Sequence, residues 1–467
     1  MNAVLFGLGG FILLQLAIGI VVSRRVRNTD DYWLAGRSLG FWMVMTSVFA
    51  TWFGAETCVS SAGGMYERGL AGGAAEPFGY GLCIIFLGSV FALPLYRRGL
   101  TTFADFYRGR FSPGVERVAV VILAPTSILW AAAQIRAFGQ VVSSTTGMGV
   151  TLSIAIAALV AMVYTSLGGL RADVITDCLQ GVIIILGLIT LAIVIVHDQG
   201  GPAATVALVD GERLRLFGGD MGFWETVETW AVPVCGSVVA QEIISRILAA
   251  RSPGIARSAT VTGGVFYLLI GIIPAFTGLI GYALLPDLDD PEQILPQLAR
   301  THLPQVLYIL FVGALVSAIL STVDSSLLAA SALLSQNLIL PLTKSPPEAL
   351  RLWTARAAVA GCGLIAFGLA LSAETIYGLV EAASSFGGAG LFVVLVFGLF
   401  TRLGGVQSAF AALVTGAATW MIAGWGLGLA CPYVASLGVA TLAYLATSLR
   451  DRTGRTGFRT PAAIQVD

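Results

Sequence analysis

The stretch SAILSTVDSSLLAAS, residues 317–331, places an aspartate and several hydroxyl side chains inside an otherwise apolar segment. At about 100° per residue, Ser321, Thr322, Asp324 and Ser325 lie on one side of a helix and converge on one or two points. Oxygen atoms of this kind are the ligands that hard cations such as Na+ prefer. Isolated Ser and Thr in membrane helices commonly bond to their own helix, so the hypothesis of a cation site depends on the aspartate and on the surrounding sequence.

The chain around this stretch has the composition of an integral membrane protein. Hydrophobic residues make up 57% of the 467 positions, charged residues 11%, and the net charge is zero. Such a chain has too little polar surface to coat a soluble globule of this size. Apolar runs of about 20 residues, each long enough to cross ~30 Å of hydrocarbon as a helix, recur along it. We expect thirteen spans, at 2–23, 41–64, 72–96, 116–143, 149–168, 173–196, 222–249, 258–284, 304–334, 352–373, 375–400, 405–424 and 427–448.

Basic residues orient the predicted bundle, because Lys and Arg are retained in short cytoplasmic loops. With the N-terminus outside, 21 of the 26 basic residues, Arg246 among them, fall on the inner side. We therefore expect a multi-pass protein of the plasma (inner) membrane with a cytoplasmic C-terminus that ends in a short tail at 451–467. No loop is long enough to build a separate core, so residues 1–467 are expected to form a single transmembrane domain.

Ionisable groups are costly inside a span and are therefore functional candidates. The predicted spans contain Glu56, Glu76, Asp177, Glu242, Asp324 and Glu381. Arg136 is the only basic residue that we expect to share the spans with them. Because most of these carboxylates have no basic partner in the spans, they indicate a cationic ligand such as Na+, H+ or a charged amine. The alternative for each is a protonated carboxyl group bonded to a neighbouring helix.

Two spans contain sequence that interrupts a helix near the membrane midplane. The second span reads FATWFGAETC at 49–58, with Gly54 among poor helix formers, and the seventh reads WAVPVCGSVV at 230–239, where Pro233 lacks an amide donor and Gly236 loosens the helix. These spans begin two corresponding five-span stretches, spans 2–6 and 7–11. Because five is odd, the stretches have opposite orientations, which predicts inverted repeats and alternating access to a central site.

Three motifs resemble the sodium:solute symporter family, and the similarity runs over nearly the whole chain. They are DYWLAGRSLG at 31–40, YTSLGGLRADVITDCLQ at 164–180 and ALVSAILSTVDSSLLAASALLSQNL at 314–338. The resemblance implies an all-α, LeuT-like bundle of two inverted five-helix repeats, with one N-terminal and two C-terminal helices added, and Na+-coupled uptake.

The resemblance also implies one or two Na+ sites. One ion would be bound by the carbonyls of Ala50, Phe53 and Ala318 and by the hydroxyls of Ser321 and Thr322, with Asp177 beside it. A second ion, seen in some relatives, would use Ser321, Asp324, Ser325 and Asp177.

Further motifs are similar to those of the high-affinity choline transporters within this family: ATWFGAE at 50–56, EPFGYG at 76–81 and ILWAAAQIRAFG at 128–139. The likeness implies a quaternary ammonium enclosed by the rings of Trp52, Tyr80 and Trp130, which suits the attraction of a cation to a ring face. Where those transporters carry a tryptophan in the seventh span, this chain has Ala240, so the cage lacks one wall. The expected substrate-binding residues are Trp52, Glu56, Tyr80, Trp130, Gln134, Gln241 and Glu242.

These observations predict a sodium-coupled symporter that imports a small organic solute, namely an amine, a quaternary ammonium or an amino-acid-like molecule. A proton-coupled transporter of the same fold, with Asp177, Asp324 or Glu242 as proton carrier, and a membrane sensor or channel are the alternatives. An enzyme is not expected, because the sequence contains no HExxH or GxGD motif. The expected partners are the solute and the lipid bilayer, without nucleic acid.

Overall fold

The computed structural model describes residues 2–24, 26, 28–216, 221–373 and 375–450, and within these ranges every regular element is helical. The predicted tail at 451–467 lies outside the described residues. The helices of the bundle are α1 Asn2–Ser23, α3 Phe41–Trp52, α4 Ser61–Arg68, α5 Tyr80–Phe86, α6 Ala92–Tyr96, α8 Pro113–Thr146, α9 Val150–Asp198, α11 Phe223–Ala231, α12 Gln241–Ala249, α13 Pro253–Leu284, α15 Gln305–Ala332, α16 Glu348–Ser372, α17 Ile376–Ser385, α18 Gly388–Phe400, α19 Val406–Met421 and α20 Pro432–Ser448. The short helices α2 Thr29–Leu34, α7 Ala104–Arg110, α10 Pro202–Val206 and α14 Ile294–His302 lie in the connections.

Two of the longest helices begin with the same local signal. Ser112 before α8 and Ser252 before α13 each accept a hydrogen bond from the amide three residues on, at 3.3 Å, and a proline follows each serine. The serine oxygen satisfies an amide that has no partner within the helix, and proline at the first helical position loses no hydrogen bond. The sequence therefore specifies where these spans begin.

The prediction of a multi-span helical membrane protein is confirmed, whereas the count of thirteen spans stays a prediction. Within the described part of the chain, nine helices are long and apolar enough to cross a membrane, or ten if the bent pair α11–α12 counts as one. Two of the nine, Glu56–Tyr96 and Val150–Asp198, contain 41 and 49 residues. At 1.5 Å per residue both far exceed the ~30 Å of a bilayer core. Each contains a residue with non-helical torsions, Glu76 in the first and Gly169 in the second.

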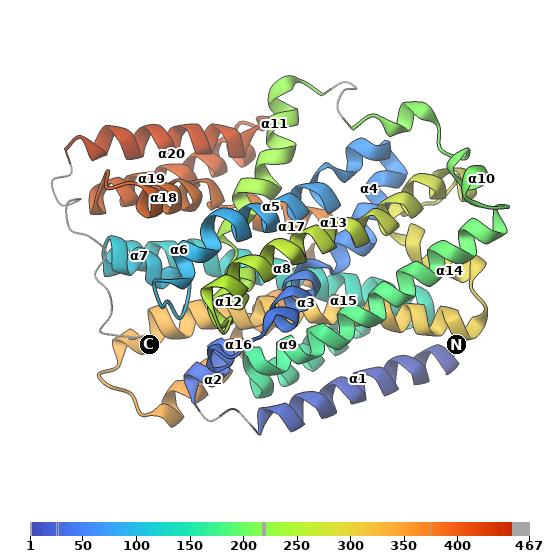
Figure 1. Cartoon of the computed structure of the whole chain (residues 1–467), viewed down its shortest axis with the longest axis horizontal. Coiled ribbons are helices and arrows are strands. Elements are labelled where there is room, and N and C mark those ends of the chain that lie inside the picture. The colour runs from blue at the N-terminus through green and yellow to red at the C-terminus, as the bar shows by residue number, and fades with distance from the viewer. Residues whose placement is uncertain (1, 25, 27, 217–220, 374, 451–467) are drawn as a thin grey trace.

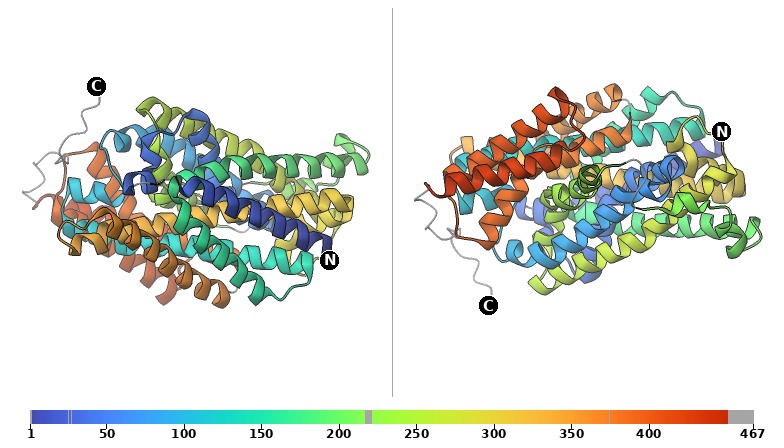
Figure 2. Two further views of the ribbon diagram at one scale, coloured as in Figure 1. Left: turned by 90° about the horizontal axis from the view of Figure 1, so that it is seen from below. Right: turned by 90° about the horizontal axis from the view of Figure 1, so that it is seen from above.

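The central helices of the bundle are α8, α9 and α15. α15 packs against both of the others, and α13 packs against α3, α4 and α5. α1 lies along one edge, against α9 and α15, while α19 and α20 pack together at the opposite edge (Figures 1 and 2). Because α15 is enclosed on several sides, every residue from Val316 to Leu333 is buried, including its polar turn.

Both predicted helix interruptions are present. α3 stops at Trp52, and helical structure resumes with the wide turn Glu56–Ser60 that leads into α4. In the seventh predicted span, α11 continues through the wide turn Val232–Gly236, which contains Pro233, and a short 3₁₀ turn to Val239. Ala240 is extended (φ −66°, ψ 119°), and α12 then departs at 46°. The sharpest bend therefore lies at Ala240, after the Pro233 and Gly236 positions that the sequence indicated.

Candidate functional site

The first interrupted span sets main-chain oxygens opposite the polar turn of α15. Phe53, just after α3, has non-helical torsions (φ −78°, ψ 61°). The amide of Gly54 donates to the carbonyl of Trp52 at 2.8 Å, instead of to Ala50 as in a continuous helix. The carbonyl of Ala50 accepts a hydrogen bond from the Ser321 hydroxyl at 3.3 Å. The end of α3, directly before the unwound segment, and α15 therefore meet at this point.

The five residues predicted to bind the first Na+ lie around this meeting point. They are Ala50, Phe53, Ala318, Ser321 and Thr322, and none is more than 3% exposed. The Thr322 hydroxyl lies 3.5 Å from the carbonyl of Ala318, and a Cβ atom added to Gly54 would lie only 2.4 Å from Thr322 Oγ1. The ligand atoms that these residues offer are all buried oxygens, and Na+ prefers such hard ligands.

Asp177 lies directly beside this set. Its carboxylate accepts hydrogen bonds from the hydroxyls of Ser321 and of Ser47, the latter at 2.5 Å. Arg246 of α12 also reaches it, with Nη2 3.3 Å from Asp177 Oδ2, and forms a second ion pair with Asp173. The Arg246 side chain is 1% exposed. The expectation that Arg136 alone shares the spans with the acids is therefore wrong, whereas the position of Arg246 toward the inner side stays a prediction.

The residues expected to bind a second Na+ divide between different partners. Ser325 accepts a hydrogen bond from Arg246 Nη2 at 2.5 Å and donates to Asp173 at 3.1 Å. Asp324 accepts instead from the Thr165 hydroxyl at 2.9 Å. Thus Ser321, Ser325 and Asp177 lie close together, and a guanidinium group stands among them.

Sequence analysis missed Asp173 and the role of Arg246, although a signal for both was present. Asp173 and Asp177 are four residues apart, which places both carboxylates on one face of α9. Arg246 stands in the apolar run IISRIL, where a buried position requires a paired acid. The charge pattern grouped Arg246 with the basic residues of the inner side because it lies near the end of the predicted span 222–249.

The three predicted cage residues also lie together. The rings of Trp52 and Trp130 are parallel within 3°, with centroids 6.1 Å apart. Tyr80 stands edge-on to both, with centroids 5.6 Å from Trp52 and 5.8 Å from Trp130. All three are at most 4% exposed. The rings therefore contact one another, and an onium ion between the two indoles would require them to separate.

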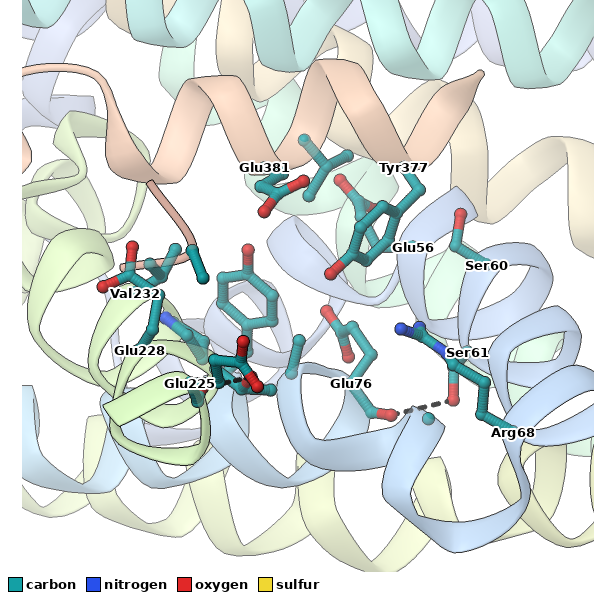
Figure 3. A pocket seen from close by; sticks show the side chains of 17 residues that line it. Glu56, Ser60, Ser61, Arg68, Glu76, Glu225, Glu228, Val232, Tyr377 and Glu381 are labelled. Atoms are coloured by element: carbon teal, nitrogen blue, oxygen red, sulfur yellow. Dashed lines mark hydrogen bonds between the residues drawn. The ribbon is translucent and has the colours of Figure 1, made fainter. Parts of the chain in front are cut away.

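An acidic cavity of about 280 Å³ adjoins this aromatic group. Figure 3 shows Tyr377 and Glu381 of α17 projecting into it from one side and residues of α11 from another. Its lining includes Glu56, Glu76, Glu225, Glu228 and Glu381 and, among the described residues, one basic side chain, Arg68. The cavity therefore favours a positively charged occupant over an anion.

Glu56 differs from the other buried carboxylate of this cavity, Glu76. Glu76 accepts hydrogen bonds from the Tyr267 hydroxyl at 2.8 Å and from Thr57 at 3.1 Å. Glu56 Oε1 accepts from Gln134 Nε2 at 2.6 Å, whereas Glu56 Oε2 has no hydrogen-bond partner among the described residues. Glu56 thus keeps one carboxylate oxygen available to a ligand.

Of the remaining residues predicted to bind substrate, some lie near the aromatic group and one lies apart from it. The Gln134 side-chain oxygen accepts from the amide of Ala55 at 2.8 Å and so ties α8 to the interrupted span. Gln241 is engaged elsewhere, because its oxygen accepts from the amide of Phe103 at 2.7 Å. Glu242 lines a small separate cavity with Trp130 and Ala240. Gln241 therefore stands apart from the aromatic group, and Glu242 lies at its border.

The end of the bundle predicted to be cytoplasmic is closed by hydrogen bonds. Arg37, before α3, donates to the carbonyls of Leu248 at 3.1 Å, Gly99 at 3.2 Å and Leu100 at 2.8 Å. Leu39 also pairs with the chain at Ala250. The inner ends of α3 and α12, which belong to the two interrupted spans, are thereby joined.

Comparison with known proteins identifies a family and several relatives of this chain. The model of the sodium:solute symporter family matches residues 32–416. High-affinity choline transporter 1 of Drosophila melanogaster is 26% identical over 399 residues, which cover 80% of this chain and 63% of that protein. The chain thus spans less than two thirds of the length of this relative. The sodium/pantothenate symporter of Haemophilus influenzae is 25% identical over 358 residues, 72% of each chain.

Solved structures show the same architecture. A substrate-bound, outward-open Na+-coupled sialic acid symporter matches with a TM-score of 0.85 at 19% identity, over 96% of this chain and 98% of its own. MhsT in complex with L-phenylalanine matches with a TM-score of 0.55 at 14% identity, over 87% of this chain and 97% of its own. The predicted all-α, LeuT-like fold is confirmed.

Proposed function

The chain belongs to the sodium:solute symporter family, a family of transporters and not of enzymes, and from this premise we propose that it imports a small organic cation together with Na+. The solute class that fits best is an amine or a quaternary ammonium. Transport follows alternating access, with the N-terminus outside the plasma membrane and the C-terminus in the cytoplasm.

The contact between Ser321 and Ala50 is the observation that carries the proposal. It brings a hydroxyl of α15 within 3.3 Å of the carbonyl of Ala50, in the last turn of α3, whose usual amide partner at Gly54 bonds elsewhere because of the break. A dehydrated Na+ bound there would draw both elements together. A ligand that binds one conformation more tightly than another increases the population of that conformation. Na+ would therefore favour the conformation in which the solute pocket next to Trp52 is complete.

The solute class rests on the charge and the rings beside that contact. A cation entering the acidic cavity would meet the available oxygen of Glu56 and, once the two indoles have separated, the rings of Trp52, Tyr80 and Trp130. A desolvated cation on such a ring gains about 2 kcal/mol. Anionic solutes, such as those named for the monocarboxylate and pantothenate transporters that this chain resembles, would meet repulsion from the glutamates.

One Na+ supplies useful driving force. An ion that crosses ~100 mV and a tenfold gradient releases about 2.3 and about 1.4 kcal/mol. Together these would concentrate a neutral solute several hundredfold, and the membrane potential acts additionally on a cationic one. Inside, the solute and Na+ would leave once the bonds of Arg37 open.

Uptake into proteoliposomes tests this function. Choline, ethanolamine, proline, pantothenate and a monocarboxylate are offered with an inward gradient of Na+, of K+ at the same pH, or of H+. We expect accumulation of a cationic solute with Na+ alone. Accumulation that follows the H+ gradient without Na+ would instead favour the proton-coupled alternative.

Replacement of Ser321 by alanine gives the matched test of the ion site. We expect Ser321→Ala to raise the half-saturating Na+ concentration about tenfold, because one hydroxyl ligand is lost. Ser331→Ala is the control, since Ser331 is equally buried on α15 but its hydroxyl bonds to the carbonyl of Leu328 in the same helix. Equal Na+ dependence of the two variants would contradict the assignment.

A further inference from the structure

The polar group around Arg246 is arranged as a cation site in its own right. Nη2 of Arg246 contacts Asp173, Asp177 at 3.3 Å and Ser325 at 2.5 Å, while Nε donates to Ser47 at 3.2 Å. These oxygens come from three different elements, α3, α9 and α15. A guanidinium group thus occupies the centre of a buried, oxygen-lined position.

This position shares residues with the Na+ site proposed above. The Ser321 hydroxyl, a proposed Na+ ligand, donates to Asp177, and Asp177 is paired with Arg246. The two positive charges would therefore be neighbours bridged by one carboxylate. A second Na+ among Ser321, Ser325 and Asp177 would lie against the guanidinium group, which repels it. The oxygens of Asp177 and Ser325 that it would need already bind Arg246.

We infer that Arg246 serves as a built-in second cation, so that this chain binds one exchangeable Na+ where a two-ion site would otherwise form. The inference rests on the proposed function and adds the ion stoichiometry to it. Asp173 and Asp177 are held in place by a charge that never leaves the protein, and Asp324, bonded to Thr165, takes no part in ion binding. Arg246 then acts on the Na+ site as a positioning residue, through Asp177.

Equilibrium binding of radioactive Na+ to the purified full chain tests this stoichiometry without knowledge of the solute. We expect one Na+ per chain in the wild type, with a Hill coefficient of about 1. Arg246→Gln removes the guanidinium group, and we expect it to bind two ions with a Hill coefficient above 1. Arg246→Lys retains the charge and should still bind one.

A second variant keeps the inference testable if Arg246→Gln does not fold. Asp324→Asn should leave both the Na+ stoichiometry and the half-saturating concentration within about twofold of the wild type. Two ions bound to the wild type, or one ion lost in Asp324→Asn, would overturn the inference and leave the proposed symport standing. No Na+ bound to the wild type would overturn the proposed coupling itself, and this inference with it.

Discussion

Gly54 is the residue whose smallness the proposed Na+ site requires most directly. A Cβ atom there would lie 2.4 Å from Thr322 Oγ1, 2.7 Å from Gln134 Oε1 and 3.1 Å from Glu56 Oε2. Contacts of this length cannot be made without displacing at least one of the three oxygens. The residue therefore permits the unwound segment, α8 and α15 to approach one another.

We predict that Gly54→Ala raises the half-saturating Na+ concentration more than tenfold and weakens solute uptake as well, because Thr322 and Glu56 both move. Uptake at varied Na+ measures the effect. Gly313→Ala on α15 is the control, since nothing lies within 4 Å of the added methyl group there. Gly54→Ala with normal Na+ dependence would show that Thr322 is not a ligand.

The ion pairs of Arg246 could not be predicted from the sequence. Ser321 and Thr322 could be grouped in advance by their positions on one helix, and the family resemblance alone placed Asp177 beside them. The ion pairs of Arg246 with Asp173 and Asp177 join α12 to α9, more than 65 positions apart in the chain. Such a pairing depends on how the helices pack, and neither hydropathy nor loop charge carries that information.

At the scale of elements, the interruptions of the two spans could be predicted, but their form only in part. Gly54 lies at the actual break, because Phe53 leaves the helix immediately before it. In the seventh predicted span, Pro233 widens a turn but does not end the helix, and the bend follows at Ala240. A proline removes one amide donor, which a wide turn accommodates, whereas the packing of α12 decides where the direction changes.

The inner ends of the interrupted spans lead to a prediction for Arg37. Its three hydrogen bonds join α3 to α12 and to the connection that follows α6. Hydrogen bonds from a charged donor are worth about 1.5–3 kcal/mol each, so their loss should increase the population of the inward-open state at least tenfold. Hydrogen exchange of Arg37→Gln should be faster in peptides from 41–52 and 241–249, and Na+ affinity should fall.

Arg97→Gln is the control for this experiment, because Arg97 is exposed at the same end of the bundle. Its hydrogen exchange should match that of the wild type. If Arg37→Gln also leaves exchange of both peptides unchanged, the closure of the inner end does not depend on Arg37.

At the scale of the whole molecule, the membrane class and the fold followed from composition and motif order, whereas the span count did not. Hydropathy divides the chain where polar residues and glycines interrupt apolar runs, as at 65–71 and 169–172. In the structure the helical path continues through both regions, although Gly69 (φ 67°, ψ −154°) and Gly169 have non-helical torsions, as does Glu76 farther along the first path. The number of crossings therefore depends on the position of the bilayer, which sequence and helix length do not specify.

The connection between α13 and α15, which is predicted to lie outside, links distant parts of the molecule through Glu292. The main chain at Glu292 packs against Gly63 of α4, with its amide nitrogen 3.2 Å from where a Cβ on Gly63 would lie. Burial, and then the charge of Asp290, raise the pKa of Glu292 to about 7. The amide at Tyr377, the charge of Arg136 and the hydroxyl of Ser60 act in the opposite direction.

This raised pKa makes the folded protein sensitive to pH in a defined direction. Between the ordinary pKa of about 4.5 and the raised value of about 7, the folded state holds a proton on Glu292 that the unfolded state has released. Stability therefore falls as pH rises through this window, and the full loss is present above it. We predict that Glu292→Gln, which cannot ionise, raises the thermal unfolding midpoint relative to the wild type at pH 8 but hardly at pH 5.

Glu67→Gln supplies the matched comparison, because Glu67 is an exposed carboxylate on neighbouring α4. It should leave the difference between pH 5 and pH 8 as in the wild type. Since Glu292 packs against α4 and interacts with the Ser60 hydroxyl and the amide of Tyr377 in α17, its ionisation should also loosen this end of the bundle. Na+ dissociation from the wild type is therefore expected to be faster at pH 8 than at pH 5 and independent of pH in Glu292→Gln. If Na+ dissociation depends equally on pH in the two proteins, ionisation of Glu292 does not control the closure of this end of the bundle, whatever its effect on stability.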